Sequence, residues 1–151
     1  MNKTLIYKHS LDYALKHDER KLYRASYDVN VACKEAIARA VNEHYSNSQL
    51  DSKAAVWDVV EQYGFERMLY VLAVTVRHKE WDMRFSSDNK QWAQNIPIFE
   101  DEVALAYDQS AYMTVDDCHS GLLNIFMTAA RQEYLQSLPC PDSVRAGKGM
   151  I

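Results

Sequence analysis

The sequence has few residues that break helices, because its 151 residues include only four Gly and three Pro. Glycine and proline are the strongest interruptions of regular structure, so long uninterrupted segments are expected. Apolar residues make up 48% of the chain and charged residues 25%, which is the balance of a folded domain rather than a disordered chain. The length suits one domain with its own core. We therefore expect a single, mainly α domain.

The sequence also lacks a long hydrophobic run. Its longest apolar stretch, Met68–Val76, has nine residues, whereas a membrane-spanning helix needs about 20. The first ten residues turn polar after two apolar positions, which is not the pattern of a signal peptide. The cysteines show no Cys-x-x-Cys spacing, which favours reduced thiols; they are Cys33, Cys118 and Cys140. We expect a soluble, cytoplasmic protein without a membrane partner.

Lysine and arginine are absent from Gln91 to Ala130, although the whole chain carries a net charge of only −4. A nucleic-acid-binding protein needs a basic surface, so the overall charge argues against free nucleic acid as the main partner. The segment has two interpretations: a solvated acidic loop, or a docking surface for a basic groove on another protein. Its six carboxylates are Glu100, Asp101, Glu102, Asp108, Asp116 and Asp117.

Apolar residues recur at spacings of three and four along most of the chain, which predicts helices. The apolar segment that begins at Phe65 fits a buried strand as well as a helix, and the Gly64 before it and the neighbouring helices favour a helix. The helices are expected at 4–16, 18–45, 51–63, 65–77, 88–95 and 120–138.

Residues with capping chemistry mark the expected helix ends. Asp51 is suited to begin a helix, and Gly64 to end one as the residue just past its last turn. Other starts are predicted at Asp18, at Ser87 or Asp88, and at Asp117 or Ser120.

Together these segments predict a bundle of five or six helices over residues 1–138. Residues 98–115 have a weak pattern that fits loops or a short hairpin. Residues 139–151 are expected to be a disordered tail.

Aromatic, cationic and acidic residues crowd together in RHKEWDMRFSSDNKQWA, which spans residues 77–93. The simplest interpretation is a structured corner between two helices, in which Asp82 and Arg84 form an ion pair. A cluster of exposed aromatics and arginine is also typical of a protein-binding hot spot, and aromatics beside cations can stack on bases. The candidate partner-binding residues here are Trp81, Arg84, Phe85 and Trp92.

A second basic group lies near the start of the long helix. Arg20 and Arg24 are one turn apart, as are Lys16 and Arg20 if the helices are continuous. The group is either a solvated helix face or a nucleic-acid contact formed by Lys16, Arg20, Lys21 and Arg24.

No motif in the sequence predicts a reaction. There is no Gly-rich phosphate loop, and His78 with Asp82 makes two metal ligands at most, so we predict no metal and no cofactor. Adjacent Cys118 and His119 need not point the same way, and Cys33 lies on the apolar stripe of the long helix. A hydrolase built on paired carboxylates stays open, but we predict no catalytic residue and no small-molecule substrate.

Four stretches of the chain, in order, resemble domain-of-unknown-function family 3849. They are LYRASYDVNVACKEAI (22–37), YGFERMLYVLAVTVRHKEWD (63–82), RFSSDNKQWA (84–93) and HSGLLNIF (119–126). The resemblance implies an origin in a bacterial phage, plasmid or conjugative element and a small accessory role.

Two functions follow from these patterns and the resemblance. The first is a non-enzymatic inhibitor of host defence, of the anti-CRISPR type, which binds a Cas nuclease or its guide-RNA complex through the acidic segment and the aromatic corner. The second is an accessory nucleic-acid-binding protein in transfer or replication of the element, which would use the basic group.

Overall fold

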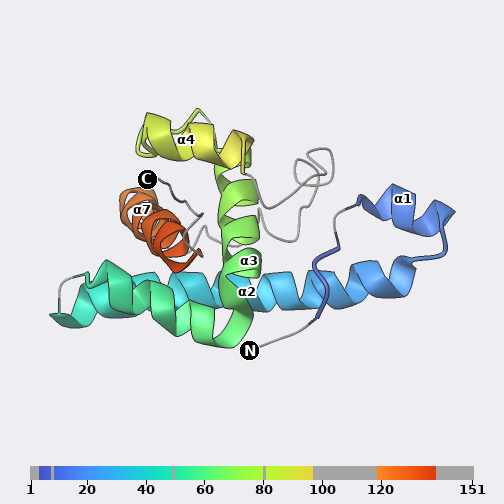
Figure 1. The fold of residues 1–151 in the computed structure, drawn as a ribbon, viewed down its shortest axis with the longest axis horizontal. Coiled ribbons are helices and arrows are strands. Elements are labelled where there is room, and N and C mark those ends of the chain that lie inside the picture. The colour runs from blue at the N-terminus through green and yellow to red at the C-terminus, as the bar shows by residue number, and fades with distance from the viewer. Residues whose placement is uncertain (1–3, 8, 49, 80, 97–118, 139–151) are drawn as a thin grey trace, which may run out of the picture.

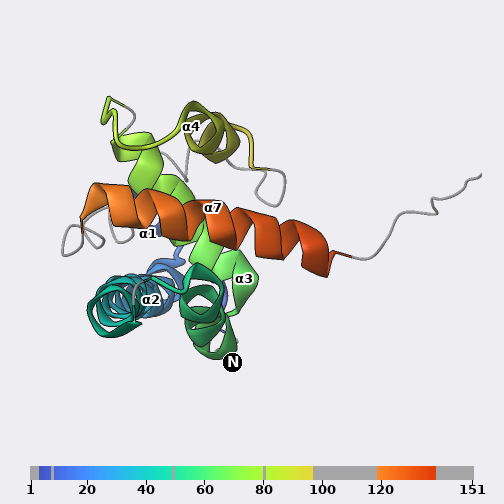
Figure 2. The same cartoon turned by 90° about the vertical axis from the view of Figure 1, so that its left-hand side faces the viewer.

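The computed structural model describes residues 4–7, 9–48, 50–79, 81–96 and 119–138. Within them the chain forms five helices and no strand, which confirms the predicted mainly α single-domain bundle. Helix α2 forms the base, α3 rises from it, and α7 lies between α2 and α4 (Figure 1, Figure 2). The helices are α1 Leu11–Lys16, α2 Arg20–Ser48, α3 Ser52–His78, α4 Ser87–Gln94 and α7 Ser120–Ser137.

The chain from 97 to 118 lies outside the described residues, as does 139–151. The loop or hairpin expected at 98–115 and the disordered tail therefore stay predictions. All six carboxylates of the acidic segment also lie there. No helix of the described chain is long and apolar enough to cross a membrane.

Helix α3 is the centre of the core. Every residue from Met68 to Val76 is buried, and the Thr75 hydroxyl donates to the Val71 carbonyl at 2.8 Å. A helix apolar on all sides must be surrounded by other elements. Here α2, α4 and α7 pack around it, so the prediction of a helix over a buried strand is confirmed. The surrounding side chains include Cys33, Ile37, Val41, Phe85, Ala93, Leu123, Phe126 and Met127.

Gly64 divides α3 into two arms. Its φ of 81° and ψ of 161° interrupt the helix, and glycine adopts such angles without the clash of a Cβ atom. The first arm runs along the second half of α2, and the second arm climbs away from it toward α4 (Figure 1). The predicted helix end at Gly64 is thus a kink that lets one segment pack in two directions. Asp51 caps the first arm as predicted, accepting from the Ala54 amide at 3.2 Å.

The first helix is shorter than the sequence suggests. Residues 4–7 are not helical, and α1 begins after Ser10, whose hydroxyl accepts from the Tyr13 amide at 3.1 Å. Asp18 is not the predicted cap, because its φ of 57° is left-handed and the Glu19 carbonyl accepts the first bond of α2, from Tyr23, at 3.0 Å. Helices α1 and α2 are therefore not continuous, and α1 folds back over the start of α2 (Figure 1).

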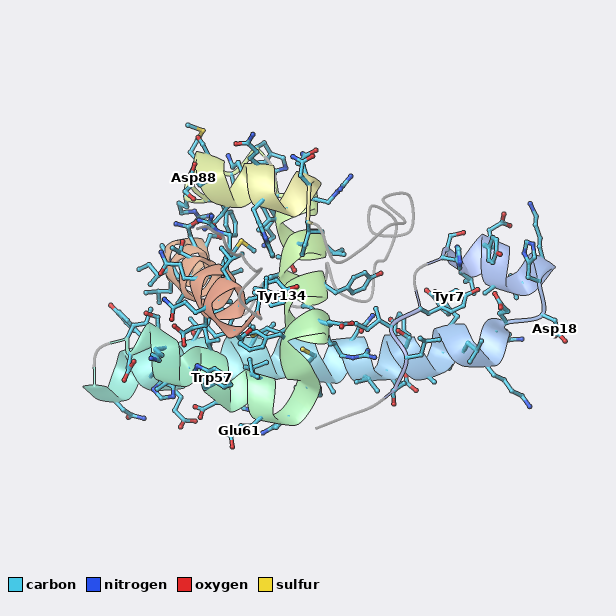
Figure 3. The ribbon with its side chains drawn as sticks, viewed as in Figure 1. Tyr7, Asp18, Trp57, Glu61, Asp88 and Tyr134 are labelled. Atoms are coloured by element: carbon cyan, nitrogen blue, oxygen red, sulfur yellow. The ribbon has the colours of Figure 1, made fainter. Side chains whose placement is uncertain are left out.

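Hydrogen bonds of buried side chains hold residues 4–7 against α2. The Tyr7 amide donates to the Ser26 hydroxyl at 2.9 Å, and the guanidinium of Arg67, 2% exposed, donates to the Thr4 carbonyl. Arg67 also donates to the Ser26 carbonyl at 3.3 Å and to the Asn30 side chain. Tyr7 lies between the two helices (Figure 3). Arg67 thus joins three segments of the chain.

Candidate functional site

The segment between α3 and α4 forms a turn with some side chains exposed and others buried. Trp81 is 76% exposed and Met83 is 89% exposed, whereas Asp82 and Phe85 are buried. The turn is closed by backbone hydrogen bonds from Asp82 to the Lys79 carbonyl at 2.9 Å and from Phe85 to the Asp82 carbonyl at 3.3 Å. We call residues 81–85 the corner.

The predicted ion pair at the corner is present. Arg84 donates to both carboxylate oxygens of Asp82, from Nε and Nη2, each at 3.1 Å, and its amide donates to Oδ1 at 3.0 Å. These Arg84 hydrogen bonds, joined by one from the Ser120 side chain, lower the pKa of Asp82 to about 2 against the opposing effect of burial. The carboxylate is therefore charged at neutral pH and holds the turn in one conformation.

The cap of α4, which follows the corner, lies one or two residues before the predicted positions. The Ser86 hydroxyl accepts from the Asn89 amide at 3.1 Å, so Ser86 is the cap and neither Ser87 nor Asp88. Asp88 lies at the outer side of this helix (Figure 3). Ser and Asp are equally good helix caps as residue types, so the backbone geometry of the turn determines which of the adjacent residues caps α4.

A buried polar network joins α4 to α7. Asn89 is fully buried, and its Nδ2 donates to Asn124 Oδ1 at 2.8 Å and to Thr128 Oγ1 at 2.9 Å. Its Oδ1 accepts from Arg131 Nε at 3.2 Å, and the Ser86 amide donates to Asn124 Oδ1 at 2.9 Å. We call these five residues the α4–α7 seam. No pattern in the sequence predicts this seam, because its partners meet only when the two helices are packed together.

The start of α7 is also capped by an unexpected residue. His119 Nδ1 accepts from the Gly121 amide at 3.0 Å, in place of the predicted Asp117 or Ser120. Ser120 is instead the first helical residue and is buried. The role of His119 in the described chain is thus structural. Asp117 and Cys118 lie outside the described residues.

The four aromatic and cationic residues predicted at the corner divide into two groups. Trp81 and Arg84 are exposed, so both can reach a partner. Phe85 is 3% exposed and Trp92 packs against the core. The hypothesis that Phe85 contacts a partner is therefore corrected, because its ring is covered by the protein itself. Trp81 and Phe85 do not share a helical face, since α3 ends at His78.

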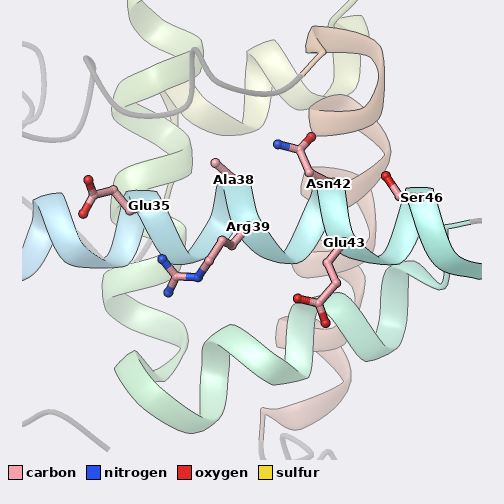
Figure 4. Close-up of a pocket in the computed structure, with 6 residues that line it drawn as sticks. All are labelled: Glu35, Ala38, Arg39, Asn42, Glu43 and Ser46. Atoms are coloured by element: carbon pink, nitrogen blue, oxygen red, sulfur yellow. The ribbon is translucent and has the colours of Figure 1, made fainter.

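A shallow groove of about 500 Å³ lies beside Trp81 and is lined by Lys90, Gln91 and Gln94 of α4. A second hollow, of about 600 Å³, follows the outer side of α2, and its six lining residues all belong to that helix (Figure 4). Its charged groups are Glu35, Arg39 and Glu43, the mixture of a solvated helix face. The groove at the corner is the better candidate because an aromatic side chain forms one wall.

The predicted basic group is partly neutralised. Lys16 Nζ lies 3.0 Å from Asp12, and Arg24 Nε lies 3.6 Å from Asp28. Arg20 and Lys21 are exposed. The same end of the molecule carries a stack of rings, with His9 and His17 on either side of Tyr13 at 4.0 and 3.8 Å between ring centres.

The described residues contain no group of three or more acidic, histidine or cysteine side chains placed to hold a metal ion. Cys33 is buried, and burial raises the pKa of its thiol to about 12. A neutral thiol in the core is a poor nucleophile, so Cys33 is a packing residue, as its place on the apolar stripe predicted.

Fold and site together define a small α-helical domain that presents an aromatic corner beside a polar groove. The chain belongs to the family described as protein of unknown function (DUF3849), whose model matches residues 6–135. The match includes the corner and both sides of the α4–α7 seam. Among curated proteins and solved structures there is no significant match.

Proposed function

We propose that the protein is a non-enzymatic interaction protein that contacts another protein through the corner. The observation that carries this proposal is the exposure of Trp81, at 76%, and of Met83, at 89%, two residues apart. Large apolar side chains exposed together are costly in water, and aromatic residues and Met are enriched where proteins bind one another. Arg84 stands next to them and is of the type that supplies binding hot spots.

The corner is also well held, which favours binding. Asp82 and Arg84 fix the turn, and the seam holds the start of α4 against α7. A surface that is ordered before it meets a partner loses less conformational entropy on binding. Trp81 is thus presented by a fixed backbone.

For the partner we propose a component of a bacterial host's defence, with a Cas nuclease and its guide RNA as the first to test. The origin in a mobile element that the family resemblance implies supports this choice. The acidic segment from Glu100 to Asp117 would steer association with a basic groove. Changing Glu100, Asp101 and Glu102 to Lys is then expected to slow association and to reduce its dependence on salt.

The nucleic-acid-binding alternative has weaker support from the described contacts. Lys16 and Arg24, two of its four cations, already face carboxylates of the same chain. Exposed ion pairs contribute little stability and can open, so Arg20 and Lys21 would have to dominate the contact. A gel shift with a single-stranded oligonucleotide at low salt tests this function, and binding lost in Arg20→Glu would favour it.

The proposed function is tested by affinity capture from a bacterial host lysate and by direct binding to a purified Cas nuclease–guide complex. The tagged full chain is compared with Trp81→Ala and with Tyr45→Ala. Tyr45 is a matched control, since it is an aromatic residue 56% exposed at the far end of α2. We expect Trp81→Ala to weaken partner binding by about tenfold or more, as for a hot-spot aromatic, and Tyr45→Ala to leave it unchanged. Equal binding by all three proteins would show that the corner is not the contact.

A further inference from the structure

We infer that the groove beside Trp81 binds an acidic peptide segment of the partner, in which a carboxylate stands next to an apolar side chain. This inference rests on the proposed function and adds the chemistry of the ligand. It is carried by the groove's lining, which combines one indole, one ammonium and two primary amides. In such a segment the carboxylate would pair with the ammonium, the backbone with the two amides, and the apolar side chain with the indole.

The geometry makes the groove continuous with the corner. Lys90 and Gln94 are four residues apart on α4 and Gln91 lies beside them, so the three share one helix face. Trp81, which precedes the helix, forms the opposite wall. The groove, of about 500 Å³, is shallow and largely open to solvent, which suits a few side chains of a bound segment more than an enclosed small molecule.

Among the described residues, the charge that lines the groove is positive. Lys90 is its one charged lining residue, is half-buried, and takes part in none of the ion pairs of the described chain. The nearby carboxylate of Asp82 is occupied by Arg84 at 3.1 Å. Residues 77–94 carry four cations against three carboxylates, so this region is positive by one on a chain of net charge −4. A carboxylate of a partner could therefore pair with an ammonium that no carboxylate of the described residues already binds.

The remaining groups favour a peptide over a nucleic acid. Primary amides donate and accept hydrogen bonds, so Gln91 and Gln94 can match the alternating carbonyl and amide groups of an extended backbone. The indole of Trp81 and the adjacent Met83, both exposed, would cover an aliphatic or aromatic side chain. A nucleic acid binds through several phosphates at once, and a single lysine in the groove cannot provide that.

The inference is tested by selecting a displayed library of random 12-residue peptides on the full-length protein. We expect enriched peptides that carry Asp or Glu beside Leu, Ile, Phe or Trp. Synthetic versions, measured by fluorescence polarisation, should bind about tenfold more weakly to Lys90→Glu, a loss equivalent to about 1.4 kcal/mol. A second selection on Lys90→Glu should exchange the acidic position for Lys or Arg.

Arg39→Glu is the control, because Arg39 is an exposed cation on α2 that does not line the groove. Its binding of the same peptides should equal that of the wild type. Enriched peptides without carboxylates, no enrichment at all, or equal binding by Lys90→Glu would overturn the inference. Binding of a 20-nucleotide oligonucleotide that Lys90→Glu abolishes would replace it with a nucleic-acid site. If lysate capture still depends on Trp81 while Lys90→Glu has no effect, the proposed function is supported, and only the inference of an acidic ligand is rejected.

Discussion

Asn89 on α4 donates from Nδ2 to Oδ1 of Asn124 on α7 at 2.8 Å, across 35 residues of sequence. The same Asn124 oxygen accepts from the Ser86 amide at 2.9 Å. The Asn124 side chain of α7 therefore holds both Ser86, the residue just after the corner, and Asn89 in the first turn of α4. Because buried polar groups need partners with particular geometry, the pair fixes the angle at which α4 leaves the corner as well as the packing of the two helices.

The first prediction concerns this pair. Asn89→Ala leaves Asn124, Thr128 and Arg131 without their shared partner in a buried place. We expect the free energy of unfolding to fall by about 2–3 kcal/mol, since an unsatisfied buried group costs about 1–3 kcal/mol. Urea unfolding followed by circular dichroism measures the change. Asn95→Ala, at the exposed end of the same helix, should cost less than about 0.5 kcal/mol. Equal losses in the two variants would contradict a special role for Asn89.

The second prediction is a dependence on pH. The pKa of Asp82 is lowered to about 2 in the folded protein, so the carboxylate stabilises the fold fully above its unfolded pKa of about 3.9, and this stabilisation is lost as the pH falls through about 2. With Arg84 half in water, we expect Asp82→Asn to cost about 1 kcal/mol at pH 7. The difference from the wild type should shrink measurably by pH 3 in urea titrations. A difference that stays constant from pH 7 to pH 3 would show that the Asp82 charge is not responsible.

The third prediction concerns the buried arginine. Arg67→Met keeps much of the volume but removes the donors to Thr4, Ser26 and Asn30. The partners left behind are neutral, and an unsatisfied buried polar group costs about 1–3 kcal/mol, so the free energy of unfolding should fall by at least that amount and residues 4–7 should open as well. Hydrogen exchange at the Tyr7 amide is the direct measurement, with faster exchange expected. Arg39→Met, on the exposed side of α2, is the control and should leave that exchange unchanged. Unaltered exchange in Arg67→Met would show that Arg67 is not needed to hold the segment.

The fourth prediction concerns the kink. At Gly64, φ is 81° and ψ is 161°, a combination that is costly for any residue with a Cβ atom. Gly64→Ala is expected to lower the free energy of unfolding by about 1–3 kcal/mol, despite the higher helix propensity of alanine. Thermal and urea unfolding measure it, with Gln62→Ala on the exposed side of the first arm as the control. A stabilised Gly64→Ala protein would show that α3 straightens at little cost.

The sequence predicted the helices well because apolar spacing extends over many residues. Met68–Val76 had to be surrounded on all sides, and Asp51 and Gly64 marked the limits of the first arm correctly. Single capping residues were predicted less well. Ser86 and His119 cap helices that the sequence assigned to neighbouring residues, because a cap depends on the backbone angles of the turn and not on residue type alone.

The candidate site was predicted only in part. The ion pair between Asp82 and Arg84 is local, so two residues of sequence were enough to suggest it. The burial of Phe85 and the exposure of Trp81 depend on where α3 ends. Apolar periodicity does not predict the end of a helix to better than about one helical turn. The seam partners Asn89 and Asn124 belong to helices that only the complete fold brings together, so no local sequence pattern predicts their contact.

The fastening of residue 4 to residue 67 also bears on how this chain is made. The two are separated by 63 positions, so the ribosome releases Thr4 long before the guanidinium that will hold it. During synthesis the segment 4–7 lacks its contact with Arg67 until the second arm of α3 has emerged and met α2. A nascent chain arrested within the first arm should therefore leave this segment open to proteases, and one arrested beyond α3 should protect it.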